Sequence, residues 1–174
     1  GASGGIGRAI AQQLGMGGAA VLLHTHRRLE VAQTLCDTLV HQGGVARVAQ
    51  ADLADPQQRA ALVEAAWRWR DGIDICVNNA GVDVLTGENA ALSFSQRLEK
   101  LWRVDVLGTV EISRAVGTRM VERAAANGDQ VILNMGWDQA AQGMAGESGE
   151  MFGTIKGAVM AFSRSLAGSL APHV

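Results

Sequence analysis

Apolar residues follow two alternating spacings along the chain, and this alternation predicts short strands separated by longer helices. Runs of consecutive apolar residues are typical of buried strands, and recurrence every three or four positions is typical of a helix face. Leu29, Ala32, Leu35 and Leu39 show the helical spacing. The predicted strands are 19–26, 45–53, 73–81 and 130–136, and the predicted helices are 8–14, 28–41, 56–70 and 151–170, with two helical stretches within 93–127.

Strands that alternate with helices of this length are the pattern of βαβ units. Such units build a parallel sheet with helices on both faces. The 174 residues fit one domain, and the chain has no internal repeat, low-complexity tract or linker. The sequence therefore predicts an α/β fold, a doubly wound parallel sheet of the Rossmann type, in a single domain over residues 1–174.

Composition narrows the class of function. Fifteen Lys and Arg against seventeen Asp and Glu give a net charge of −2, which gives no reason to expect a nucleic-acid partner. No apolar run reaches the roughly 18 residues of a membrane span, so no membrane partner is expected. Cys36 and Cys76 form neither a disulfide framework nor a metal spacing, which favours a cytoplasmic location. His24 and His26 share one strand face without a further ligand nearby, and no metal site is predicted.

The chain opens on a glycine-rich turn, GASGGIG, directly before a predicted helix. In such a turn, backbone N–H groups and the positive end of the helix can meet a pyrophosphate. Glycine is needed where the chain turns sharply, where it approaches the ligand and where the helix packs on a strand. Gly1, Gly5 and Gly7 are the candidates for these places.

This turn and three later segments resemble the short-chain dehydrogenase/reductase family. GASGGIGRAIA is similar to the family's TGxxxGxG turn without its leading Thr, and ADLAD (51–55) resembles the segment with the family's acidic adenine contact. NNAG (78–81) matches the family motif letter for letter. The segment KGAVMAFSRSLAGSLAPH (156–173) resembles the helix with the catalytic Lys. The resemblance covers essentially the whole chain and implies an NAD(P)-dependent oxidoreductase. It implies cofactor contacts at Gly1, Ser3, Gly5, Ile6, Gly7, Thr25, His26, Arg27, Asp52, Leu53, Asn79, Ala80, Gly81 and Lys156.

The residues at the end of the predicted strand 19–26 favour NADP(H) over NAD(H). This strand corresponds to the second strand of the family. In dinucleotide folds an acidic residue at this strand end holds the ribose 2′-OH of NAD. The resemblance places uncharged Thr25 there, followed by His26, Arg27 and Arg28, and a guanidinium suits a 2′-phosphate. A solvated helix start is the alternative interpretation of the two arginines. Gly4 argues against NADP(H), because many NADP-binding relatives carry a basic residue there.

The family's catalytic positions are mostly changed. The resemblance implies a Tyr-x-x-x-Lys pair, a Ser upstream and an Asn in the central helix. Lys156 matches, but Phe152 stands at the Tyr position, Trp137 (after Gly136) at the Ser position and Asp105 at the Asn position. Phenylalanine has no ionisable proton and cannot act as the acid or base. We therefore expect the standard carbonyl-reduction chemistry to be lost or strongly reduced.

A substitute acid is the alternative hypothesis. Asp138 follows the expected Ser position, and Glu147 and Glu150 lie in the loop before the last helix. A carboxyl group against apolar Trp137 and Phe152 would have a raised pKa, and it could protonate a substrate together with Lys156. Solvated loop charges are the competing interpretation of all three.

Three functions therefore stay open: an NADP(H)-binding protein with little catalysis, an active reductase with a substitute acid, and a cofactor-free structural subunit. Asp105 is expected to pair with Lys156, in a role that is structural first and catalytic second. The resemblance also implies a strand before the glycine turn, at the centre of the sheet, and further elements after Val174. We expect these residues to be a fragment of a longer protein whose small-molecule substrate is not identified. The helices near 101–127 and 151–170 match those that the family uses for dimers and tetramers, which predicts a homo-oligomer.

Overall fold

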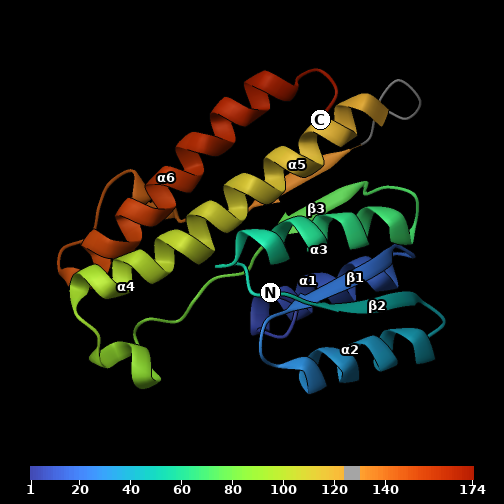
Figure 1. Cartoon of the computed structure of the whole chain (residues 1–174), viewed down its shortest axis with the longest axis horizontal. Helices are drawn as coiled ribbons and strands as arrows, with labels where there is room; N and C mark the ends of the chain where they lie inside the picture. Colours follow the sequence, from blue (N-terminus) through green and yellow to red (C-terminus); the bar gives the residue numbers. More distant parts are fainter. Residues whose placement is uncertain (124–129) are drawn as a thin grey trace. The chain divides into compact units, whose positions relative to one another are not determined.

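The structure is a computed structural model that describes residues 1–123 and 130–174, and these form two compact units, Gly1–Ala66 and Trp67–Val174 (Figure 1). The first unit contains α1 (Gly5–Met16), β1 (Ala20–Thr25), α2 (Leu29–His41), β2 (Val45–Gln50) and most of α3 (Pro56–Trp69). The second contains β3 (Ile75–Asn78), α4 (Phe94–Leu101), a π-helical segment (Trp102–Leu107), α5 (Gly108–Arg123), β4 (Val131–Asn134) and α6 (Glu147–Leu170), with short 3-10 turns at Gly87–Ala91 and Asp138–Ala140.

The first unit is built on the parallel pair β1–β2. The ladder runs from Ala20 opposite Val45 to Thr25 opposite Gln50. Both α1 and α2 contact β1, and their apolar faces form one core with it. The buried members of this core are Ala11, Val21, Leu23, Leu35, Cys36 and Leu39. The carboxyl ends of β1 and β2 therefore lie side by side, next to the glycine turn that precedes α1.

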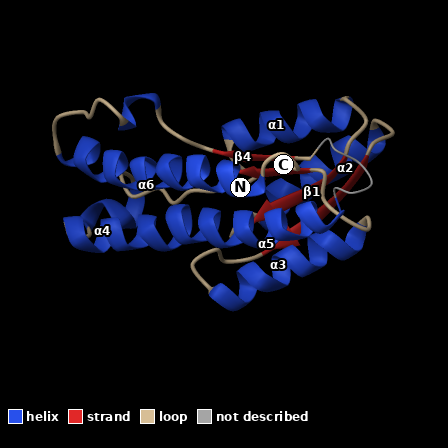
Figure 2. Cartoon of the chain, turned by 90° about the horizontal axis from the view of Figure 1, so that it is seen from above, coloured by secondary structure: helices blue, strands red, loops and turns tan. Residues whose placement is uncertain are grey.

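The second unit combines the parallel pair β3–β4 with long helices. The pairing runs from Ile75 opposite Val131 to Asn78 opposite Asn134. Helix α4, the π-helical segment and α5 follow one another without a break, and α5 lies alongside α6 in both views (Figures 1 and 2). The buried core of this unit combines Val84, from the loop after β3, with five residues of the helices: Leu101, Val106, Met151, Ile155 and Val159.

The predicted order of strands and helices is confirmed, and two boundaries and one connection are corrected. Helix α1 begins at Gly5 instead of residue 8, because Gly4 is already its extended N-cap. Helix α6 begins at Glu147, four residues before the predicted start. The two helical stretches expected within 93–127 are joined by the π-helical segment, and the end of that prediction, 124–127, lies outside the described residues.

The strands form two separate parallel pairs, whereas the sequence predicts one parallel sheet. Each unit has its own two-stranded parallel ladder. The parallel direction of both ladders and the helix between successive strands are those of the predicted α/β class.

His24 on β1 is expected to make the stability of the chain fall as the pH drops from 7 to 5. Its Nε2 lies 3.0 Å from the Ala51 carbonyl oxygen and its Nδ1 lies 2.9 Å from the Gly1 nitrogen. Burial lowers the pKa of His24 to about 4. The unfolded chain, with a histidine pKa near 6.5, then binds more protons than the folded chain, so acidification favours unfolding by about 2 kcal/mol over this range.

Urea unfolding at pH 7 and pH 5 measures this effect, with His24→Gln as the comparison. The wild type should lose more stability between the two pH values than the variant, because glutamine does not titrate. Equal losses in the two proteins would show that other groups cause the pH dependence.

Candidate functional site

The glycine turn is fixed to β1 by hydrogen bonds that involve both its backbone and its side chains. The Ala2 N–H donates to the His24 carbonyl at 2.8 Å, and the Thr25 hydroxyl donates to Ser3 Oγ at 3.2 Å. The turn then enters α1 through Gly4, which provides no side-chain cap, and the first turn of α1 contains no acidic residue. The N–H groups at the positive end of α1 therefore have no side-chain cap at Gly4 and no acidic neighbour within the first turn.

Gly5 has no packing reason to be a glycine. A methyl group built at Gly5 would meet nothing within 4 Å, and the backbone there does not have the positive φ that favours glycine. At Gly4 the same methyl group would lie 3.5 Å from Nη2 of Arg28, an ordinary contact distance. The turn thus fits a group that approaches the backbone from outside, as a dinucleotide pyrophosphate would.

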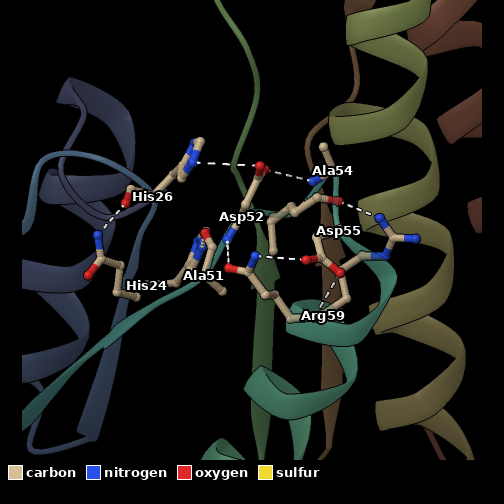
Figure 3. A network of polar contacts seen from close by, with 10 residues as sticks. His24, His26, Ala51, Asp52, Ala54, Asp55 and Arg59 are labelled. Carbon is tan, nitrogen blue, oxygen red and sulfur yellow. Dashed lines mark hydrogen bonds and ion pairs between the residues drawn. The ribbon is translucent and has the colours of Figure 1, made fainter.

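Polar side chains gather at the carboxyl ends of β1 and β2. His26 Nε2 lies 3.7 Å from Asp52 Oδ2, and Asp52 Oδ1 accepts the Ala54 N–H at 2.9 Å (Figure 3). The His26 carbonyl accepts a hydrogen bond from Gln50 Nε2 at 2.8 Å. These contacts hold the Asp52 carboxylate, the expected adenine contact, beside the end of the neighbouring strand.

The side chain of Thr25, an expected cofactor contact, is buried in the first unit. Thr25 is 1% exposed, and its hydroxyl is bonded to Ser3. It therefore links the strand to the glycine turn and does not present a donor at the surface, whereas His26 and Arg27, the other two expected contacts here, are exposed. Leu53 is also buried, so only its backbone can serve a ligand.

The NNAG segment at the end of β3 is held by a network of amides and hydroxyls. Asn78 Nδ2 donates to Ser113 Oγ and to Asn134 Oδ1, both at 2.9 Å, and Asn134 Nδ2 donates to Ser163 Oγ at 2.9 Å. The network joins β3, β4, α5 and α6. The sequence motifs do not predict these two serines, because Ser113 lies outside every quoted motif and Ser163, within 156–173, is brought to Asn134 only by the packing of α6 on β4. This hydrogen-bond network holds the NNAG segment in place, and the segment carries the expected contacts Asn79, Ala80 and Gly81.

Asp105 and Lys156 form a buried ion pair in the second unit. Lys156 Nζ lies 3.3 Å from Asp105 Oδ2, and Asp105 Oδ1 accepts the Val82 N–H at 3.0 Å. The Asp105 side chain is 5% exposed and the Lys156 side chain 18%. Burial raises the pKa of Asp105 above its ordinary value, although Lys156 and the Val82 N–H oppose this effect. A methyl group at Gly81 would lie 2.8 Å from Asp105 Oδ2, so packing requires this glycine.

Aromatic side chains stand where the family resemblance implies hydroxyls. Phe152 lies one helical turn before Lys156 on α6, and its half-buried ring packs against the core of the second unit. Trp137 is half-buried and precedes the 3-10 turn Asp138–Ala140. At Gly136 an added methyl group would lie 3.2 Å from Cγ of Met160. Neither Phe152 nor Trp137 offers a hydroxyl, and indole can only donate from its N–H.

The three candidate substitute acids lie at exposed positions. The Asp138 carboxylate accepts the Gln139 N–H at 2.9 Å within its own turn. Glu147 pairs with Arg97 at 2.6 Å, and Glu150 lies in the first turn of α6. Lys156 pairs with Asp105 instead.

Within 1–123 and 130–174, His, Cys, Asp and Glu do not gather in any group of three or more that could hold a metal ion. In the same ranges, every helix is too short or too polar to cross a membrane.

The strands alternate with helices, the glycine turn before α1 is open, and Lys156 pairs with Asp105, whose carboxylate lies beside Gly81 of the NNAG segment. These features define a class: a Rossmann-like α/β protein of the oxidoreductase type. The family model described as short chain dehydrogenase matches residues 1–174. The chain belongs to the short-chain dehydrogenase family, as its sequence motifs imply.

Individual relatives agree with this assignment. The chain is 31% identical to an uncharacterized oxidoreductase of Methylorubrum extorquens, over 99% of the chain and 66% of the relative. It is 33% identical to the short-chain reductase protein NovJ of Streptomyces niveus, over 99% of the chain and 62% of the relative. The chain therefore spans less than the full length of the curated relatives that it matches, about half in the case of a mycobacterial fatty acyl-CoA reductase (54%).

Solved structures confirm the fold. A metagenomic short-chain oxidoreductase in complex with NADP superposes with a TM-score of 0.86 at 26% identity, covering 99% of this chain and 75% of that chain. A blue fluorescent protein from a metagenomic library, in complex with NADPH, gives a TM-score of 0.82 at 30% identity, with 99% and 67% covered.

Proposed function

We propose that the chain binds NADP(H) and has lost most or all of the Ser/Tyr carbonyl-reduction chemistry of its family. The observation that carries this proposal is the combination of an open glycine turn with Phe152 and Trp137 at the two hydroxyl positions. The substrate is unassigned. A homo-oligomer formed through the regions of α5 and α6 and a cytoplasmic location remain predictions from the family resemblance.

The first unit supports the cofactor part of the proposal. Gly5 leaves its surface open, and the exposed side chains at the end of β1 are basic. Two of the superposed relatives contain NADP or NADPH. The glycine turn would hold the pyrophosphate, Asp52 the adenine, and the cations after β1 the 2′-phosphate. When bound, the nicotinamide of such a cofactor supplies or accepts a hydride.

The second unit supports the catalytic part. Phe152 cannot move a proton, and a missing general acid or base typically lowers a rate by about 10²–10⁴. Trp137 replaces an expected donor to the substrate oxygen, and such donors are worth about 10²–10³. Lys156 remains, but its ammonium is paired with the Asp105 carboxylate. The chain thus keeps the Lys156 ammonium and lacks the tyrosine and serine hydroxyls that act together with this lysine in the family pattern.

The variant Gly5→Ala separates a glycine kept for a ligand from a glycine kept for folding. The added methyl group meets nothing within 4 Å, so the free energy of unfolding should stay equal or rise by about 0.5–1 kcal/mol. The same methyl group stands where the pyrophosphate approaches, so the dissociation constant for NADPH should rise about tenfold or more. Energy transfer from tryptophan to the nicotinamide measures the constant, and urea unfolding measures the stability.

Gly168→Ala is the matched control, because Gly168 is an exposed glycine within α6 and also leaves its methyl position open. It should raise stability in the same way and leave the affinity for NADPH unchanged. If Gly5→Ala bound NADPH as tightly as Gly168→Ala, the turn would not be the pyrophosphate site. If the parent protein bound neither NADPH nor NADH, the cofactor-free structural subunit would take the place of this proposal.

A further inference from the structure

The three positions that depart from the family pattern gather along α6 in the second unit. Phe152 and Lys156 lie one turn apart, so they share one face of this helix. The Asp105 carboxylate reaches Lys156 Nζ at 3.3 Å. The 3-10 turn that follows Trp137 packs on α6 as well. The changes therefore occur together in the fold, and they are best explained together.

The side chains at these positions do not suit the proton transfer that carbonyl reduction needs. A ketone that accepts a hydride becomes an alkoxide, and a neighbouring acid must protonate it. Phe152 has no acidic proton, and the Lys156 ammonium is held by Asp105. A hydride acceptor that becomes neutral without a proton would not need these missing groups.

An iminium ion is such an acceptor. Its carbon takes the hydride, a C–H bond forms, and the π electron pair of the C=N⁺ bond passes to the nitrogen. The reduced nicotinamide loses the hydride and is oxidised, and the iminium ion is reduced to a neutral amine. No proton enters or leaves in this step.

The charge around Lys156 suits a cationic substrate. With the asparagine of the family pattern, the Lys156 ammonium would keep its full positive charge and repel a cation. Asp105 instead places a carboxylate 3.3 Å from this ammonium, so the two charges offset each other. Asp138, directly after Trp137, and Glu150, in the first turn of α6, add negative charge at exposed positions.

Phe152 and Trp137 also favour a cation. The face of an aromatic ring attracts positive charge, and indole does so most strongly. Both residues are half-buried, so part of each side chain stays accessible. The substitutions that remove the two hydroxyls of the family pattern therefore add surfaces that bind positive charge, from which a neutral ketone gains less.

We propose that the chain reduces preformed iminium ions, with the charged C=N⁺ group held by Trp137 and Phe152 and with Asp105 offsetting the charge of Lys156. This inference rests on the proposed NADP(H) binding, because the cofactor is the source of the hydride. It gives the three changed positions one explanation. The groups for proton transfer are absent because the reaction uses none, and the charge of Lys156 is neutralised because the substrate is a cation.

The first test follows NADPH consumption at pH 7 with N-methyl-3,4-dihydroisoquinolinium, an iminium ion, and with α-tetralone, an uncharged ketone of similar shape. The iminium ion should be reduced faster than in a mixture without protein, and the tetralone should stay at the background rate. Because no proton moves in the reaction, the rate in D₂O should match the rate in H₂O.

A second readout uses no cofactor. Calorimetric titration at pH 8 compares N-methylisoquinolinium, a cation, with isoquinoline, which is uncharged at this pH. The parent should bind the cation more tightly, with an affinity that falls as salt is added. Trp137→Leu should lower this preference by a factor of about 2 to 30. Asp105→Asn, which leaves the Lys156 charge unpaired, should lower it by about tenfold.

Matched controls remove the same groups elsewhere. Trp102→Leu changes an exposed tryptophan of the π-helical segment, and Asp37→Asn an exposed carboxylate of α2, so both should keep the preference for the cation. Circular dichroism checks that each variant is folded. Trp137→Phe replaces the leucine variant if that one is not, and it should lose less of the preference because it keeps an aromatic ring.

The outcomes separate this inference from the proposed function. A parent that binds NADPH but reduces the iminium ion only at the background rate, or prefers isoquinoline, overturns this inference while cofactor binding stands. An unchanged preference in both the Trp137 and Asp105 variants, or a rate that falls in D₂O, overturns it as well. A parent that reduces α-tetralone as fast as the iminium ion overturns the proposed loss of carbonyl chemistry too. A parent that binds no NADPH overturns the proposed function together with this inference.

Discussion

Replacing Lys156 with methionine is expected to lower the free energy of unfolding at pH 8 by about 3 kcal/mol. Methionine keeps most of the volume of the side chain and removes its charge. The Asp105 carboxylate, 5% exposed and 3.3 Å from Lys156 Nζ, would then be a buried charge without its partner. Breaking one side of a buried ion pair is costly for this reason, even where the intact pair adds little.

The loss should shrink as the pH falls. Burial already raises the pKa of Asp105 in the folded chain, and removing Lys156 raises it further. A carboxyl group with a higher pKa in the folded than in the unfolded state makes stability fall as the pH rises through the range between the two values. Lys156→Met should therefore be less destabilised at pH 5 than at pH 8.

The double variant Lys156→Met with Asp105→Asn provides the control. It removes both charges and keeps the amide oxygen as an acceptor for the Val82 N–H, so it should recover much of the loss and show little pH dependence. Urea unfolding of the three proteins at both pH values is the measurement. A loss below about 1 kcal/mol that does not change with pH would mean that Asp105 and Lys156 act independently.

Restoring the missing groups together should produce a carbonyl reductase. The triple variant Phe152→Tyr, Trp137→Ser and Asp105→Asn returns the proton donor, the hydroxyl for the substrate oxygen and the amide of the family pattern. Because such groups act as a unit, each single variant should gain little and the triple variant about 10²–10⁴ in rate. The serine belongs at residue 137, since a side chain at Gly136 would crowd Met160 at 3.2 Å.

The rate is followed as NADPH consumption against a panel of aldehydes and ketones, with the cofactor saturating. Lys156→Met in the triple background should remove the gain, because the new tyrosine then loses the cation that lowers its pKa. A parent protein that already turns over as fast as the triple variant would favour the substitute-acid hypothesis instead. In that case Asp138→Asn should abolish the activity.

The sequence predicts the order of elements and much of the site, because both depend on local patterns. The NNAG segment and the spacing from Phe152 to Lys156 are read directly from the chain, and the expected pair of Asp105 with Lys156 is present. The position of Arg28 next to Gly4 depends on how a long side chain crosses from α2 to α1. Tertiary packing determines the position of this side chain, and no spacing of residues in the sequence predicts it.

The buried position of Thr25 could have been predicted. Val21, Leu23 and Thr25 alternate along β1, and all three are buried. A strand places every second side chain on the same face, so the apolar face of β1 includes Thr25. The family position alone suggests a cofactor contact, whereas the period of the strand places the Thr25 side chain on the buried face.

The most direct test of the central claim is a titration of the parent protein with NADPH, followed by energy transfer from its tryptophans to the nicotinamide. The claim predicts saturable binding with a dissociation constant on the order of micromolar, tighter than that for NADH. Absence of saturable binding, measured on protein shown to be folded, would contradict it and leave a structural subunit with a dehydrogenase fold.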